Sequence, residues 1–142
     1  KLTIPATFKF LEKQEWTGQN IGIVKFDNVW NQVRYFEQVA KGEEVTKEAL
    51  SAIGREAKNC AIQGVNGQMI KLALVNIFNY IREHNLKSRI ISAVHDEVVI
   101  EVAEGEESHC DNYKLMMEVA GDFFLDGVKM EAEGGLNKCW SK

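Results

Sequence analysis

Residues 89–94 (RIISAV) and 98–102 (VVIEV) are two short runs rich in β-branched residues, and His95, Asp96 and Glu97 separate them. Such runs are typical of strands, because branched side chains pack well on a pleated surface. Two strands this close along the chain form a hairpin when a short turn joins them. The stretch therefore predicts an antiparallel hairpin with charge at its tip.

Apolar residues at helical spacing dominate the rest of the chain. They predict helices over residues 27–40, 47–59, 63–83 and 106–125 and a last strand over 128–132. Asp27 is the expected cap of the first of these helices. Turn residues interrupt the pattern in 1–25, which predicts only short strands or an irregular hairpin. Glu104, Glu106 and Glu107 predict a solvated acidic loop at the start of a helix. The expected fold class is α+β, in which a small antiparallel sheet containing the charged hairpin packs on long helices.

The composition limits the classes of function. The chain has 142 residues, 45% of them hydrophobic and 27% charged, which is typical of about one globular domain. A formal net charge of -4 argues against a domain that holds nucleic acid by bulk positive charge. Three widely spaced cysteines predict reduced thiols in a cytosolic protein, and no long apolar run predicts a membrane span. Because the first residue is Lys rather than Met, we expect a piece of a longer protein.

The hairpin tip is the first candidate site. Polar residues between two apolar strands are costly unless they are paired, hydrated or bound to a metal. Neighbouring carboxylates on a turning backbone point in different directions, so Asp96 can ligate a divalent cation while Glu97 supports it. A turn with solvated acids explains the same residues, and the tip alone does not separate the two interpretations.

A second candidate site lies upstream, where Arg55, Asn59 and Gln63 are spaced four residues apart. On a helix this spacing places the three side chains along one face. Amide and guanidinium groups can reach the acceptors that every base pair presents in the minor groove, so the row predicts a grip on duplex nucleic acid that is independent of sequence. A polar face that only keeps the helix soluble has the same spacing.

Taken in order, these motifs resemble the end of a family A DNA polymerase, the family of bacterial DNA polymerase I and many phage enzymes. The matching stretches are Arg55-x-x-x-Asn59-x-x-Ile62-Gln63-Gly64, Lys71-Leu72-Ala73, Val94 to Glu101, and the close with Gly134-Gly135 and Trp140. The resemblance runs from about Gly54 to Lys142. Within it, Cys60-Ala61 replaces the family's usual small residue and proline, and Val65-Asn66-Gly67 replaces a commoner Thr-Ala-Ala.

The resemblance implies a role for each site residue. Asp96 matches the aspartate of the family's motif C, a ligand of the catalytic magnesium ions, and Glu97 matches the neighbour that supports the metal site or the primer end. His95 matches the histidine that approaches the primer terminus. The residues that match the family's contacts to primer and template in the minor groove are Arg55, Asn59 and Gln63.

The resemblance also implies the function of the whole enzyme, which is template-directed DNA synthesis from dNTPs with Mg2+. We expect residues 47–142 to be the C-terminal part of the palm, and residues 1–46 have no assigned role. The motif A aspartate and the fingers helix are not visible in the sequence, so the partners include remaining polymerase segments as well as primer–template DNA. The expected location is the cytoplasm of a bacterial cell or of a phage-infected host, and the chain is either a subunit of a split polymerase or a cut fragment.

Three alternatives stay open from the sequence. One is the palm of a single-subunit RNA polymerase, which also uses a His-Asp hairpin, although Glu97 and the Arg-Asn-Gln-Gly motif favour DNA synthesis. Another is a catalytically incomplete nucleic-acid-binding scaffold, which has no need of Asp96. The third is a small metal-dependent hydrolase, which needs a second pair of carboxylates on strands.

Overall fold

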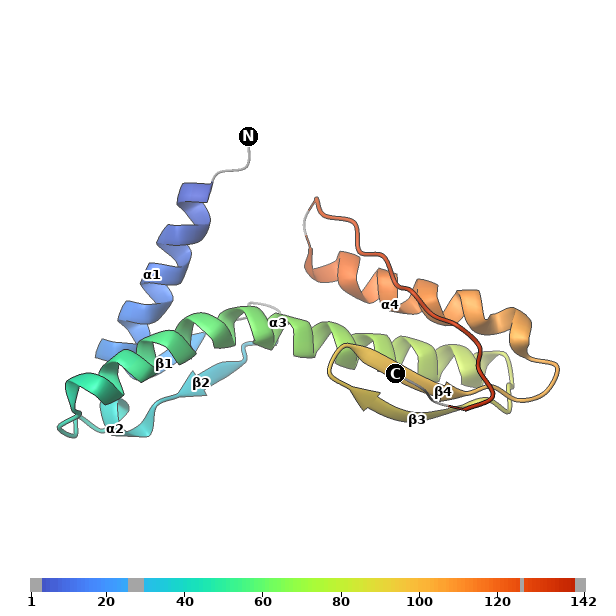
Figure 1. Cartoon of the computed structure of the whole chain (residues 1–142), viewed down its shortest axis with the longest axis horizontal. Coiled ribbons are helices and arrows are strands. Elements are labelled where there is room, and N and C mark those ends of the chain that lie inside the picture. The colour runs from blue at the N-terminus through green and yellow to red at the C-terminus, as the bar shows by residue number, and fades with distance from the viewer. Residues whose placement is uncertain (1–3, 26–29, 126, 140–142) are drawn as a thin grey trace. The chain divides into compact units, whose positions relative to one another are not determined.

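The computed structural model describes residues 4–25, 30–125 and 127–139, and it divides into two compact units, Lys1–Val65 and Asn66–Lys142. The elements follow the order α1, β1, β2, α2, α3, β3, β4, η1 and α4 (Figure 1). β1 pairs with β2 and β3 pairs with β4, both antiparallel. Two small antiparallel sheets with long helices confirm the α+β class.

In the first unit, helix α1 (Ile4–Asn20) lies where the sequence predicted short strands, so that prediction was wrong. The glycine that suggested a turn has another use. Gly18 is buried, and a Cβ atom placed on it would come within 2.6 Å of the Ala57 Cβ atom. Gly18 therefore allows close contact between two helices and does not reverse the chain. For this reason the glycine wrongly suggested a turn.

The predicted helix over 27–40 was also wrong within the described residues. Strand β2 (Val33–Tyr35) pairs with β1 (Ile23–Lys25), and only the four-residue helix α2 (Glu37–Ala40) follows. Val24 and Phe36 pack with Ala57 as the core of this unit, so tertiary packing overrides the helical spacing of the apolar residues. Asp27, the predicted cap, lies outside the described residues.

Helix α3 (Lys47–Glu83) is one continuous helix of 37 residues where two helices, 47–59 and 63–83, were predicted. Its start agrees with the sequence, because the Ala49 backbone N–H donates to the Thr46 hydroxyl oxygen over 3.3 Å. Gly64 and Gly67, near the start of the second predicted helix, cost helix stability but do not break α3. α3 begins in the first unit and ends in the second.

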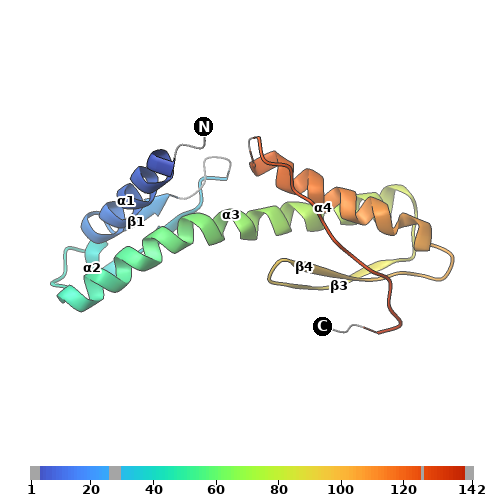
Figure 2. The same ribbon diagram turned by 45° about the horizontal axis from the view of Figure 1, so that its top comes forward.

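The second unit holds the predicted hairpin, β3 (Arg89–Val94) and β4 (Glu97–Glu101), drawn in yellow in Figure 1. The predicted last helix is present as the 3-10 turn η1 (Glu107–His109) and helix α4 (Cys110–Phe124). In Figures 1 and 2, α4 runs along the C-terminal half of α3. The core of the unit is formed by Ile77, Ile81 and Tyr113, with the hairpin residues Ile90, Val98, Ile100 packed against them.

The predicted strand over 128–132 was wrong, because the described residues from 127 to 139 form no helix or strand. Side-chain carboxylates of α4 take the place of a strand partner: Asp122 accepts from the Met130 backbone N–H and Glu118 accepts from the Ala132 backbone N–H, each over 3.1 Å. Trp140 lies outside the described residues. Among the described helices, none is long and apolar enough to cross a membrane.

Candidate functional site

The hairpin tip is a tight turn made of two residues. Val94 pairs with Glu97, so His95 and Asp96 alone connect the strands. The His95 backbone has a φ of 57°, in the left-handed region that residues with a Cβ atom seldom adopt. Two-residue hairpin turns normally place Gly or Asn at such positions. A histidine held there is a local strain of the kind found at functional sites.

The side chains at the tip face solvent. His95, Asp96 and Glu97 are all exposed, and the Asp96 carboxylate has no hydrogen bond or ion pair with any other described residue. Its two oxygens are therefore available to a ligand. Within the described parts of the chain, no group of three or more His, Cys, Asp or Glu side chains is arranged to hold a metal ion. The hairpin can supply part of a metal site, with other ligands from elsewhere.

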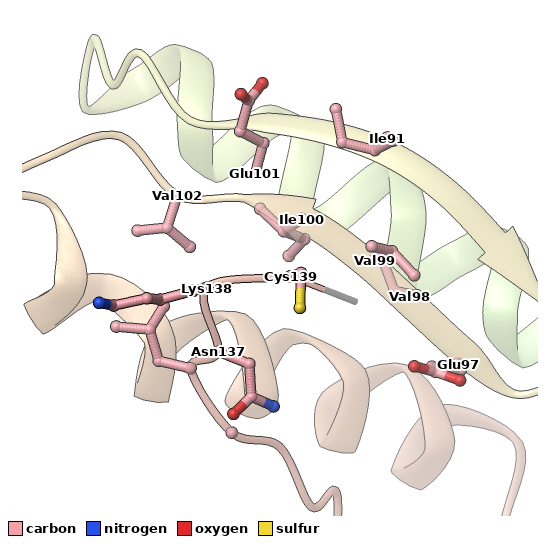
Figure 3. A pocket seen from close by; sticks show the side chains of 12 residues that line it. Ile91, Glu97, Val98, Val99, Ile100, Glu101, Val102, Asn137, Lys138 and Cys139 are labelled. Carbon is pink, nitrogen blue, oxygen red and sulfur yellow. The ribbon is translucent and has the colours of Figure 1, made fainter. Parts of the chain in front are cut away.

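A cavity of about 690 Å³ lies beside the hairpin, between β4 and residues 135–139. Glu97 lines it near the turn, and Lys138 lies toward Val102 at its other end (Figure 3). Val98, Val99 and Ile100 of β4 also line it. The sequence offered no signal for this cavity, because nothing in its pattern shows that residues after the last helix come to lie over β4.

On α3, the predicted polar row is open to solvent. Arg55, Asn59 and Gln63 are all exposed, at four-residue spacing on one helix face. The Arg55 guanidinium donates to the Ser51 hydroxyl oxygen over 2.9 Å, which orients it along the row. Donors and acceptors are thus aligned over two turns of a rigid element.

Other faces of α3 are covered by α1 and β2. The Lys58 ammonium pairs with Glu15 of α1 at 2.5 Å, and the Arg34 guanidinium of β2 pairs with Glu56 at 2.5 Å. The Gln19 side-chain amide of α1 also donates to the Leu50 carbonyl over 2.9 Å. These contacts fix the part of α3 that carries the row without covering the row.

The predicted site residues therefore fall into two groups. The structure places His95, Asp96 and Glu97 together at the hairpin tip in the second unit, and the row of α3 in the first unit.

A half-buried hydrogen-bonded cluster at the base of the hairpin was not predicted from the sequence. The Glu106 carboxylate accepts from the backbone N–H groups of Lys87 and Ser88, over 2.8 and 2.9 Å, and from the Ser88 hydroxyl over 2.6 Å. The Lys87 backbone N–H, followed by the Ser88 hydroxyl, lowers the pKa of Glu106 below its ordinary value of 4.5. Its acidic neighbours in the sequence suggested only a solvated loop, so no local signal identified this role.

Comparisons with known proteins agree with the motifs. The model of the family described as DNA polymerase family A matches residues 3–142. DNA polymerase I of Pseudomonas aeruginosa is 27% identical over 139 residues, covering 97% of this chain and 14% of that protein. DNA polymerase I of Borreliella burgdorferi is 32% identical over 110 residues, 77% of this chain and 12% of that protein. The chain thus spans about an eighth of these relatives.

A solved structure is also similar. The POL domain of Pol1 from M. smegmatis, in complex with DNA primer-template and dNTP, matches with a TM-score of 0.67 and 28% identity, covering 80% of this chain and 19% of that chain. The matches do not favour the RNA polymerase, scaffold and hydrolase alternatives.

Proposed function

The chain belongs to DNA polymerase family A, and we propose that residues 47–142 are the C-terminal part of the palm of an enzyme that extends a primer on a DNA template. In this reaction the primer 3′-hydroxyl oxygen attacks the α-phosphorus of a dNTP, and the bond to pyrophosphate breaks. Residues 1–46 keep no assigned role. The reaction takes place in the cytoplasm of a bacterial or phage-infected cell, and the chain acts with other polymerase segments that carry motif A and the fingers.

One observation carries the proposal. The hairpin presents the Asp96 carboxylate at a two-residue turn, exposed and without a protein partner among the described residues, beside a histidine in a strained backbone conformation. A carboxylate that only stabilises the fold needs a partner, and a turn that only reverses the chain needs no strain. Binding of a metal ion and substrate at the tip explains both the unpaired carboxylate and the strained turn.

The donor set at the tip fits Mg2+, a hard cation that prefers carboxylate oxygens and keeps several water ligands. Asp96 supplies a direct ligand, and Glu97, next along β4, supports it or the primer end. Mg2+ bound there stabilises negative charge on the attacking and leaving oxygens. Since the described residues offer no third ligand from the groups that commonly bind metals, we assign the remaining carboxylate to a segment outside this chain.

His95 and the α3 row hold the nucleic acid in this proposal. His95 lies next to Asp96 at the tip, where the primer end must come for the reaction. Arg55, Asn59 and Gln63 contact primer and template through minor-groove acceptors, which are present on every base pair, so the grip does not depend on sequence. Hydrogen bonds rather than bulk charge provide this contact, in agreement with the acidic composition.

The test is primer extension with Mg2+ and all four dNTPs, using this chain together with the polypeptide that supplies the rest of the polymerase. We expect extension by the wild-type combination and none by the Asp96→Ala combination, while both bind primed duplex equally. Asp111→Ala is the matched control, because Asp111 is an exposed carboxylate on α4, far along the chain from the tip. Undiminished extension by Asp96→Ala refutes the assignment.

A further inference from the structure

The base of the β3–β4 hairpin is closed by hydrogen bonds beyond the last pair of its ladder, Arg89 and Glu101. Ser88 precedes β3, and its side chain is 3% exposed. Its hydroxyl accepts from the Ala103 backbone N–H over 3.1 Å and donates to the Glu106 carboxylate over 2.6 Å. The residue that enters the hairpin is therefore tied to the residues that follow it.

The Glu106 carboxylate is the acceptor at the centre of these hydrogen bonds. Glu106 accepts three hydrogen bonds, two of them from backbone N–H groups at the entrance to β3. Because those donors favour the ionised carboxylate, the pKa of Glu106 is lowered and the acceptor is present at neutral pH. We call Ser88 and Glu106 the hairpin clamp.

The clamp adds to what the hairpin's own sequence supplies, because the turn and the ladder are both irregular. The turn is strained at His95, and the register shifts between Ile90 and Ser92, where β3 has an irregularity. A slip of one residue moves every side chain of a strand to the opposite face. Burial of Ile90, Val98 and Ile100 opposes a slip of this kind, and what it leaves open is a smaller displacement that moves Asp96.

Apolar packing alone does not prevent smaller displacements of the strands. The hairpin packs through Ile90, Val98 and Ile100 against the core of the second unit. All three are aliphatic and of similar size, and the hydrophobic effect has no direction, so this contact tolerates small displacements along the strand. Hydrogen bonds have short, directional geometry and do not.

We propose that Ser88 and Glu106 are positioning residues for catalysis: the hairpin clamp holds the base of β3 in place against the residues that follow β4 and so fixes where the Asp96 carboxylate lies. The inference rests on the proposed function, because it deepens the role of the same tip. Neither residue touches substrate. They act through β3 and β4 on Asp96, the proposed metal ligand.

The experiment uses the complete polymerase that contains this chain, with Ser88→Ala and Glu106→Gln. We expect kcat to fall about tenfold and the Mg2+ concentration for half-maximal rate to rise by a similar factor, as when a residue that supports a metal ligand is removed. The Kd for primed duplex stays within about twofold of wild type, because the α3 row is unchanged. Ser88→Thr keeps the hydroxyl, so its Mg2+ concentration for half-maximal rate stays at the wild-type value.

Three controls separate positioning from simple loss of stability. Glu107→Gln and Ser108→Ala make the same chemical changes next to the clamp and leave the Mg2+ requirement unchanged. Ile77→Val removes a methyl group from the core beneath the sheet, where Ile77 is fully buried. It lowers the Tm without a change in the Mg2+ requirement. If one clamp variant fails to fold, the other still gives the comparison.

The outcomes are distinct from those of the test of function. If Asp96→Ala still extends primers, the proposed function fails and the clamp has no site to position. If Asp96→Ala is inactive while Ser88→Ala and Glu106→Gln lower the Tm but keep the wild-type kcat and Mg2+ requirement, the proposed function stands. The clamp is then only structural, and the inference is overturned.

Discussion

Gln68 on α3 is fully buried, and neither its side-chain oxygen nor its side-chain nitrogen has a hydrogen-bond partner among the described residues. Burying a polar group without a partner costs about 1–3 kcal/mol in proteins. We therefore expect Gln68→Met to stabilise the chain. Met has nearly the same length and helix propensity as Gln, so packing and helix formation change little.

The expected gain is about 2 kcal/mol in the free energy of unfolding, since two polar atoms are relieved while some relaxation around the wild-type amide already reduces the cost. Guanidinium chloride unfolding followed by the circular dichroism of the helices measures it. With a denaturant slope of roughly 4 kcal/mol per molar for a chain of this size, the midpoint rises by about 0.5 M.

The matched control is Gln38→Met on α2, where the side chain is exposed. Its free energy of unfolding should change by no more than about 0.5 kcal/mol, the usual limit for surface substitutions. A midpoint for Gln68→Met below that of the wild type refutes the reasoning. It means that the amide has a partner, such as an internal water, whose hydrogen bonds the thioether cannot replace.

Three further predictions concern the second unit. Because Lys87 and Ser88 lower the pKa of Glu106, the contribution of this carboxylate to stability is present above pH 4.5 and is lost as the pH falls through the folded-state pKa. The Tm difference between wild type and Glu106→Gln should therefore shrink from about pH 7 to about pH 3, and a constant difference contradicts the prediction. Gly121→Ala places a Cβ atom 2.7 Å from the Met130 Cβ atom and should destabilise by about 1–3 kcal/mol in denaturant unfolding. Adding Met130→Gly, which removes that Cβ atom, should relieve the clash in a double-mutant cycle. His95→Gly removes the strain of a left-handed residue and should stabilise the chain by about 1 kcal/mol while slowing primer extension by the complete enzyme; faster extension argues against a role for the imidazole.

The hairpin was predictable because its signal is local and strong. Branched residues on both sides of His95-Asp96-Glu97 leave little choice but two strands and a turn, and the structure differs by one residue at each end of β4, which runs from Glu97 to Glu101. The spacing of Arg55, Asn59 and Gln63 likewise predicted one helix face, and the three side chains are exposed along α3. Local composition and short-range periodicity decide both features. Their roles in binding stay predictions.

The errors lie where distant contacts decide the structure. Gly18 and the residues after it suggest a turn in isolation, and only the close approach of Ala57 explains a helix there. Residues 128–132 have the composition of a strand, but α4 offers carboxylates to their backbone instead of a neighbouring strand. Glu106 looks like a solvated acid until Ser88, far from it along the chain, comes within hydrogen-bond distance.

The distribution of charge supports a division of labour between the two units. Residues 66–142 carry eight Lys and Arg against thirteen Asp and Glu, whereas residues 1–65 carry nine against eight. An acidic unit repels a phosphate backbone, so the hairpin tip cannot attract a primer and a triphosphate by its own field. In the proposed function, a divalent cation at Asp96 would reverse the local sign and let the same carboxylate that repels the substrate help to bind it. The near-neutral first unit lacks the excess of positive charge on which non-specific binding depends, so the proposed contact with the duplex rests on hydrogen bonding from the α3 row.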